Sequence, residues 1–197
     1  ANGLSVTKYH AGLSAEERKE NQDSFIYDIK PVVVATNAFG MGIDKSNVRF
    51  VMHYNMPQCI ENYYQEAGRA GRDGEDSECV LLYSPQDIMI NKFFIEHREP
   101  NPDIDAEEQA RLMILDKRRL NAMVDYCKTT GCLREYILKY FGERPDNPKG
   151  GRYNCHNCSN CVIDEAEREA DEAYMYPGNR FSAPVSRNDA MVADRMK

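Results

Sequence analysis

The sequence predicts an α/β domain with a mainly parallel sheet, followed by a small α-helical metal-binding module. Apolar runs at residues 32–34 and 50–52 each precede a turn, and a polar helix carrying two arginines follows the second run. Strand, glycine-rich turn, strand and helix in this order are typical of a parallel α/β unit. Three cysteines within residues 155–161 have the C-x-x-C spacing of zinc sites.

The elements of the α/β part follow from helix start and stop signals. Ser14 and Glu17 form a capping box that opens a helix, and this helix keeps Ile29 among its apolar positions until Pro31 ends it. The apolar run 32–35 predicts a strand buried on both faces. The other expected elements are a short strand at 4–6, strands of the same sheet at 48–54 and 79–83, and helices at 60–72 and 85–97.

A second part begins where two prolines interrupt the pattern, at Pro100 and Pro102. Beyond them, residues 106–127 and 133–141 predict a helical hairpin. We therefore expect three regions: an α/β domain at 1–99, a helical metal-binding domain at 100–163, and a tail at 164–197. The tail is expected to begin as an acidic helix and to end in a polar stretch.

Composition and charge limit the function classes. The chain of 197 residues has 42% hydrophobic residues and a net charge of −7. It contains no apolar run near 18 residues and no secretory signal, so we expect a cytoplasmic protein without a membrane partner. Residues 111–152 hold 10 basic and 5 acidic side chains. A local basic face can bind DNA phosphates within an acidic protein, and Lys117 and Arg118 are candidates for a duplex-binding surface.

The two arginines of the predicted helix 60–72 are candidates for phosphate chemistry. At about 100° per residue, Gln65, Arg69 and Arg72 fall within roughly 60° of one another. Guanidinium groups placed in this way neutralise the charge that develops on a transferring phosphoryl group. The alternative interpretation is a solvated helix with surface arginines.

The cysteine cluster supplies three ligands of a predicted structural zinc site, namely Cys155, Cys158 and Cys161. A tetrahedral site needs a fourth ligand from elsewhere in the chain. The candidates are Cys132, Cys127 and His156, and Cys132 is preferred. A disulfide is the lesser alternative, because a reducing compartment disfavours it.

Two motifs carry a resemblance to a known family. Residues 35–44 (A-T-N-A-F-G-M-G-I-D) and 64–74 (Y-Q-E-A-G-R-A-G-R-D-G) resemble motifs five and six of the RecQ family of DNA helicases. Residues 9–13 (Y-H-A-G-L) resemble a shorter motif ahead of them, and the likeness extends to about residue 161. It implies an N-terminally truncated second RecA-like lobe followed by a zinc-binding domain. It also implies an ATP-dependent 3′-to-5′ DNA helicase of repair and recombination.

The resemblance implies a role for individual residues. Gln65, Arg69 and Arg72 would be catalytic, and Asp44 would join the two arginines in contacting ATP. His10 and Thr36 would contact the DNA backbone. The element Tyr140-Phe141-Gly142-Glu143 matches one that follows a zinc-ligating cysteine in the family, and the spacing to it selects Cys132.

No G-x-x-x-x-G-K-[ST] loop occurs in the sequence, and magnesium-binding carboxylates of the usual kind are missing too. ATP and magnesium are therefore expected only together with the first RecA-like lobe, and the chain reads as a fragment that is inactive alone. The other expected partners are single-stranded and duplex DNA, and association with the bacterial nucleoid is expected. The alternative function is a non-enzymatic, zinc-containing DNA-binding or regulatory module.

Overall fold

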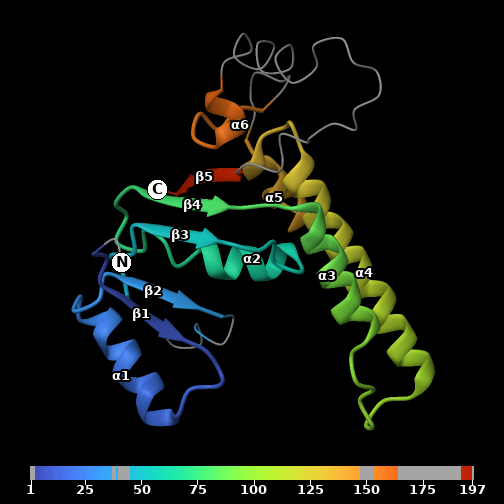
Figure 1. Ribbon diagram of the computed structural model, residues 1–197. Coiled ribbons are helices and arrows are strands. Elements are labelled where there is room, and N and C mark those ends of the chain that lie inside the picture. Colours follow the sequence, from blue (N-terminus) through green and yellow to red (C-terminus); the bar gives the residue numbers. More distant parts are fainter. Residues whose placement is uncertain (1–2, 37–38, 40–44, 147–152, 164–191, 197) are drawn as a thin grey trace, which may run out of the picture. The chain divides into compact units, whose positions relative to one another are not determined.

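The computed structural model describes residues 3–36, 39, 45–146, 153–163 and 192–196, and Figure 1 follows these elements along the chain. The chain forms two compact units, Ala1–Asn47 and Val48–Lys197. Each unit has its own sheet, and each is described by itself below. None of the described helices combines the length and the apolar character needed to cross a lipid bilayer.

The first unit is a strand–helix–strand element. Strands β1 (Val6–Tyr9) and β2 (Val32–Ala35) pair in parallel, with helix α1 (Ala15–Ile26) between them in sequence. The predicted capping box is confirmed, because the Ser14 hydroxyl accepts from the Glu17 N–H at 3.1 Å and the Glu17 carboxylate accepts from the Ser14 N–H at 2.9 Å.

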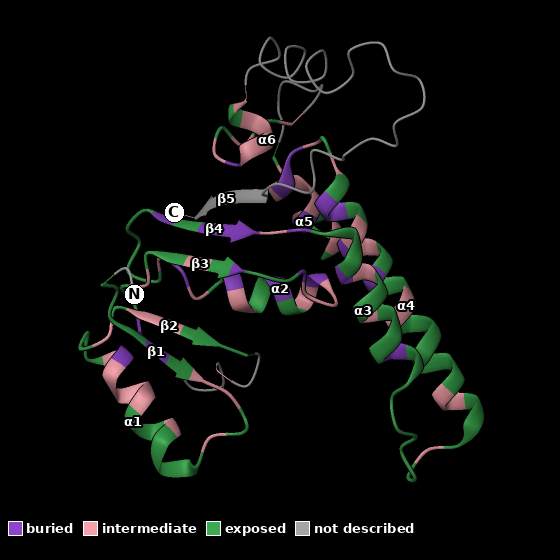
Figure 2. Ribbon diagram, viewed as in Figure 1, coloured by how far each residue is buried: buried purple, intermediate pink, exposed green. Residues whose placement is uncertain are grey.

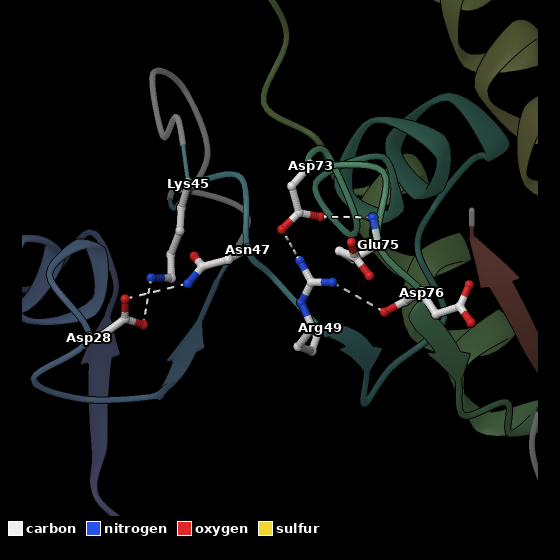
Figure 3. Close-up of polar contacts among 7 residues, drawn as sticks. All are labelled: Asp28, Lys45, Asn47, Arg49, Asp73, Glu75 and Asp76. Atoms are coloured by element: carbon white, nitrogen blue, oxygen red, sulfur yellow. Dashed lines mark hydrogen bonds and ion pairs between the residues drawn. The ribbon is translucent and has the colours of Figure 1, made fainter.

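Helix α1 ends five residues before Pro31, so the predicted end of this helix is wrong. Lys45 explains the early end, because its Nζ donates to the carbonyl oxygen of Ile26 at 3.2 Å. It also donates to Asp28 Oδ1 at 2.8 Å, as Figure 3 shows. Asp28 has a left-handed backbone (φ 60°), which cannot continue a helix. Ile29 is consequently 65% exposed instead of lying on an apolar helix face.

Burial of β2 on both faces is also not observed. Val34 of this strand is 65% exposed, and within the described residues β2 pairs only with β1. The expectation of one sheet containing all the predicted strands is likewise wrong for the described residues, because their hydrogen bonds form two sheets.

The second unit contains a three-stranded sheet. Strand β3 (Phe50–His53) pairs in parallel with β4 (Ser77–Leu81), and β5 (Val192–Met196) pairs with β4 in antiparallel orientation. Strand β5 was not predicted, because the polar end of the tail shows little periodicity. A five-residue strand that completes the ladder of β4 depends on distant pairing, which the local sequence does not encode. Residues 164–191, where an acidic helix was predicted, lie outside the described residues.

The helices in the described part of the second unit are α2 (Ile60–Ala67), α3 (Pro85–Glu96), α4 (Ala106–Lys128), α5 (Leu133–Tyr140) and the short α6 (Ser159–Val162). Three of these five helices agree with the prediction, α2 is shorter than predicted, and the one-turn α6 was not predicted. Helices α3, α4 and α5 lie within one residue of their predicted ends. Helix α2 ends five residues earlier than predicted, which changes the arrangement of the two arginines.

A single hydrophobic core joins α2, β4, α4 and α5. The rings of Tyr63 on α2 and Tyr126 on α4 lie 5.3 Å apart, and Leu120, Met123 and Leu133 are fully buried beside them. Figure 2 shows that burial is concentrated in the C-terminal half of α4, whereas its N-terminal half is mostly exposed. The helix that precedes the two arginines therefore shares a core with α4 and with α5, whose N-cap is Cys132.

Candidate functional site

The two arginines lie on a turn and not on a helix. Helix α2 ends at Ala67, and residues 68–74, here named the arginine turn, leave its axis. The prediction that Gln65, Arg69 and Arg72 share one helical face is therefore wrong. The cause is Gly71, whose φ is +63° and whose N–H donates to the carbonyl oxygen of Val48 at 3.0 Å. A left-handed residue whose N–H is bonded outside the helix cannot continue the helix.

Arg69 has an unusual electrostatic environment for an arginine. It is half-buried, and its Nε lacks a hydrogen-bond partner among the described residues. Burial lowers the pKa of its guanidinium, and the positive charge of Arg72 lowers this pKa further. A buried donor without an acceptor is costly, so an anion that accepts from Arg69 would remove a penalty that the free protein carries.

Gln65 and Arg72 complete the predicted trio and are both exposed. The Nε of Arg72 lies 3.5 Å from the carbonyl oxygen of Gly68, which is a long and weak contact. The structure thus brings together one half-buried and one exposed guanidinium within four residues of chain. Such a pair is suited to a polyphosphate, whose oxygens can accept from both groups.

Sequence reasoning missed the residues that hold the arginine turn. Arg49 forms an ion pair with Asp73, directly after Arg72, and its Nη1 donates to the carbonyl oxygen of Asp76 at 3.3 Å. Asp73 Oδ1 also accepts from the Glu75 N–H at 3.1 Å, and Figure 3 shows these contacts. No local spacing pairs Arg49 with an acidic residue 24 positions later, so this contact could not be predicted from the sequence.

A second contact joins the last residue of β3, His53, to the last turn of α2. His53 Nε2 lies 2.8 Å from Glu66 Oε2, and the His53 side chain is only 8% exposed. His53 Nδ1 lacks a partner within the described residues. An imidazole that carries its proton on Nε2 fits this arrangement, because the carboxylate then accepts the only ring N–H. This pair, too, was missing from the sequence-based prediction.

Four thiols form the second candidate site. Their Sγ atoms lie within 4.8 Å of one another and belong to Cys132, Cys155, Cys158 and Cys161. The Sγ atoms of Cys132 and Cys158 are 3.9 Å apart, close to the separation of about 3.8 Å that tetrahedral Zn–S bonds impose. The residues present therefore fit a zinc ion with four sulfur ligands.

Backbone N–H groups donate hydrogen bonds to two of these sulfurs and so favour their thiolate form, which is the form that binds a cation. The N–H groups of Cys158 and Glu135 point at the sulfurs of Cys155 and Cys132, at 3.2 Å and 3.5 Å. Burial raises the pKa of Cys158 to about 11. Burial acts in the same direction on Cys155, but hydrogen bonds from backbone N–H groups and from the thiols of Cys132 and Cys158 together outweigh it and lower the pKa of that thiol. A bound cation would favour the thiolate form at all four positions.

The two alternative ligands lie outside this cluster. Cys127 is buried in the hydrophobic core, where burial raises its pKa to about 12. His156 is exposed and has a left-handed backbone (φ 55°). Of the three candidates for the fourth ligand, only Cys132 joins the cluster.

The predicted DNA-contacting residues of the first unit share one edge of its sheet. His10 follows β1 and Thr36 follows β2, and the strands are parallel with Tyr9 paired to Ala35. Both residues therefore lie just beyond the carboxyl ends of their strands, where ligands bind in open α/β sheets. Thr36 is exposed and its N–H donates to the carbonyl oxygen of Tyr9 at 3.0 Å. Asp44, the predicted ATP-contacting residue, lies outside the described residues.

The basic residues of the helical hairpin are partly engaged in ion pairs. Lys117 Nζ lies 2.7 Å from Glu96 Oε1, so its charge is partly neutralised within the protein. Arg118 is exposed. Of these two predicted contacts with duplex DNA, Arg118 is the more accessible.

Comparison with known proteins places both sites in one family. A family model described as the helicase conserved C-terminal domain matches residues 1–74, which include the arginine turn. A model described as RecQ zinc-binding matches residues 85–162, which include the four cysteines. The chain belongs to the RecQ family. The family resemblance and the RecA-like fold class that the motifs predicted are thereby confirmed.

Curated relatives of this RecQ chain include proteins from bacteria and animals. It is 49% identical over 175 residues to the ATP-dependent DNA helicase RecQ of Bacillus subtilis (strain 168), covering 88% of this chain and 27% of the relative. The RecQ helicase of Pasteurella multocida (strain Pm70) is 43% identical over 162 residues, covering 81% and 23%. The mouse ATP-dependent DNA helicase Q5 is 40% identical over 160 residues, covering 79% and 16%. The RecQ chain thus spans about a quarter or less of each of these relatives.

Proposed function

We propose that this chain supplies the nucleotide-contacting arginines and the zinc module of an ATP-dependent DNA helicase of the RecQ type. The observation that carries the proposal is Arg69, a half-buried guanidinium with an unpartnered Nε beside Arg72 on the arginine turn. The curated relatives support the same class of activity, because they are named ATP-dependent DNA helicases.

The chemistry assigned to the arginine turn is charge neutralisation. Arg69 and Arg72 contact the phosphates of ATP and stabilise the charge that develops on the γ-phosphoryl group. Gln65 and Asp44 help to position the nucleotide. Arginines that act in this way typically accelerate phosphoryl transfer by about 10³- to 10⁵-fold.

A partner lobe supplies the remaining catalytic groups. The sequence contains no loop of the G-x-x-x-x-G-K-[ST] type, so the phosphate cradle and the magnesium-binding carboxylates belong to the first RecA-like lobe. This segment alone would not hydrolyse ATP. Binding of ATP draws the two lobes together, hydrolysis releases them, and the alternation moves the helicase in the 3′-to-5′ direction along single-stranded DNA.

DNA contacts and the metal site complete the proposal. His10 and Thr36 hold the backbone of the single strand, and Lys117 and Arg118 contact phosphates of the duplex. A structural zinc ion is bound by Cys132, Cys155, Cys158 and Cys161, and four thiolates leave no open position for chemistry. The module stabilises the helicase that acts in DNA repair and recombination.

The test is DNA-stimulated ATP hydrolysis by the complete gene product, comparing the wild type with Arg72→Ala. We expect a loss of hydrolysis of at least about 10³-fold, with binding of a fluorescent ATP analogue retained. Arg98→Ala is the control, because Arg98 pairs with Asp116 away from the arginine turn. Unchanged hydrolysis in Arg72→Ala would remove the catalytic assignment. A wild-type protein that binds DNA and zinc but hydrolyses no ATP would support the non-enzymatic module instead.

A further inference from the structure

Arg49, directly before strand β3, and His53, at its end, each contact an acidic residue close to the two arginines in sequence. Arg49, directly before the strand, contacts Asp73, the neighbour of Arg72. His53, the last residue of the strand, contacts Glu66, three residues before Arg69. The acidic partners thus flank the two arginines in sequence, and both are held from the same strand.

Several contacts attach the arginine turn to Arg49 and its neighbour Val48. The guanidinium of Arg49 reaches the carboxylate of Asp73 and the carbonyl oxygen of Asp76, and so spans the exit of the arginine turn (Figure 3). One residue earlier, the carbonyl oxygen of Val48 accepts from the Gly71 N–H. The residues on either side of Arg72 are therefore bonded to the two residues that precede β3.

The contact between His53 and Glu66 fixes the last turn of α2. The 2.8 Å contact to Glu66 is largely shielded from solvent, because His53 is buried and Glu66 is half-buried. The negative charge of Glu66 acts on the guanidinium of Arg69 and opposes the effect of Arg72. The Arg69 N–H also donates to the carbonyl oxygen of Glu66 at 3.3 Å. His53 thereby holds the residue to which the backbone of Arg69 is bonded and whose charge acts on its guanidinium.

We propose that Arg49 and His53 are positioning residues that fix Arg72 and Arg69, respectively, for contact with the phosphates of ATP. This inference rests on the proposed function. A paired strand is a rigid support, and its two ends set the place of both guanidiniums at once. Displacement of a charge-neutralising group by about 1 Å is enough to lower a rate by about 10²-fold.

The contact at Arg49 contributes little to folding. The side chains of Arg49 and Asp73 are 42% and 27% exposed, and ion pairs of this exposure contribute little to stability. A purely structural role therefore predicts a small effect on both stability and catalysis. A positioning role predicts a large effect on kcat with a small effect on stability.

The experiment measures kcat and KM for DNA-stimulated ATP hydrolysis by the complete gene product, together with its melting temperature. Arg49→Met and His53→Phe remove the two contacts, while Arg49→Lys and His53→Gln keep a donor. The matched control is Asp116→Asn, which breaks the 3.0 Å pair with Arg98. We expect at least a tenfold loss of kcat in Arg49→Met and His53→Phe, a change in KM below threefold, and recovery to within threefold of wild type in the conservative variants.

The results separate this inference from the proposed function. If Arg72→Ala abolishes hydrolysis while Arg49→Met and His53→Phe behave like Asp116→Asn, the positioning roles are wrong and the proposed function stands. If only one of the two variants loses kcat, the other residue has no positioning role. If Arg72→Ala itself is active, both proposals are overturned. Should His53→Phe not fold, Glu66→Gln tests the same contact with less change in volume.

Discussion

The hydroxyl of Tyr140 donates a 2.9 Å hydrogen bond to Glu61 Oε1, across 79 positions of sequence. Tyr140 ends α5, which begins beside Cys132, and Glu61 lies in the first turn of α2. The neighbouring rings of Tyr64 and Phe141 are 5.2 Å apart and reinforce the contact. The helix that leads into the arginine turn is therefore joined to the helix that leads out of the cysteine cluster.

Removing this hydrogen bond should loosen α2. Tyr140→Phe leaves Glu61 without one of its donors, and hydrogen bonds to charged groups contribute about 1.5–3 kcal/mol when buried. We expect a loss of about 1 kcal/mol in the free energy of unfolding, because Glu61 is partly exposed. Hydrogen exchange of the α2 amides should become faster.

The control for this change is Tyr136→Phe. Its hydroxyl donates to the carbonyl oxygen of Ala122 at 3.1 Å, within the helical hairpin. This variant should leave the exchange of the α2 amides at the wild-type rate. Equal exchange in the two variants would contradict a specific link between α5 and α2.

Loss of one cluster thiol should remove the metal. We expect Cys132→Ala to reduce the zinc content, measured by atomic emission, from one ion per chain to nearly none. Because Cys132 and Cys158 are also part of the hydrophobic core, metal loss should unfold the α5 region. Cys127→Ala is the matched control, since it removes an equally buried thiol that is not in the cluster. Full zinc content in Cys132→Ala would disprove its role as a ligand.

Two glycines of the arginine turn allow a matched test of its backbone. A Cβ added at Gly71 would lie 2.5 Å from Ser77 Oγ and 2.9 Å from the carbonyl oxygen of Glu75, in addition to the strain of φ +63°. Gly74 also has a positive φ, but a Cβ there meets no atom within 4 Å. Denaturant unfolding should show a loss of about 1 kcal/mol for Gly74→Ala and about 2–4 kcal/mol for Gly71→Ala. Equal losses would mean that the turn relaxes around the added atom.

The pair between Arg49 and Asp73 predicts a shifted titration. The hydrogen bond from Arg49 lowers the pKa of the Asp73 carboxyl below its ordinary value of 3.8. The stabilisation is therefore present above the unfolded-state pKa and is lost as the pH falls through the lower folded-state pKa. Carboxyl-carbon NMR should show the Asp73 pKa rising towards 3.8 in Arg49→Met. Asp28, whose pKa is lowered by Lys45, should titrate as in the wild type.

Local signals predicted most of the helices. The Ser14 capping box, which predicted the start of α1, is encoded within four residues of chain. The zinc-type spacing of the last three cysteines is equally local. The choice of Cys132 needed the family resemblance, because a ligand 23 positions before Cys155 has no fixed spacing.

The sequence by itself determined the α/β class, the helical hairpin and the family, and it singled out Arg69 and Arg72 as candidates. Only the tertiary structure decided how those arginines are presented. Periodicity extends α2 through Arg72, but the Gly71 N–H bonds to the carbonyl oxygen of Val48, two residues before β3, and this non-local contact is incompatible with a helix through Arg72. The supports at Arg49 and His53 are likewise pairs between residues 24 and 13 positions apart. Such pairs form only when the sheet brings β3 beside the arginine turn, and no local pattern of residues specifies them.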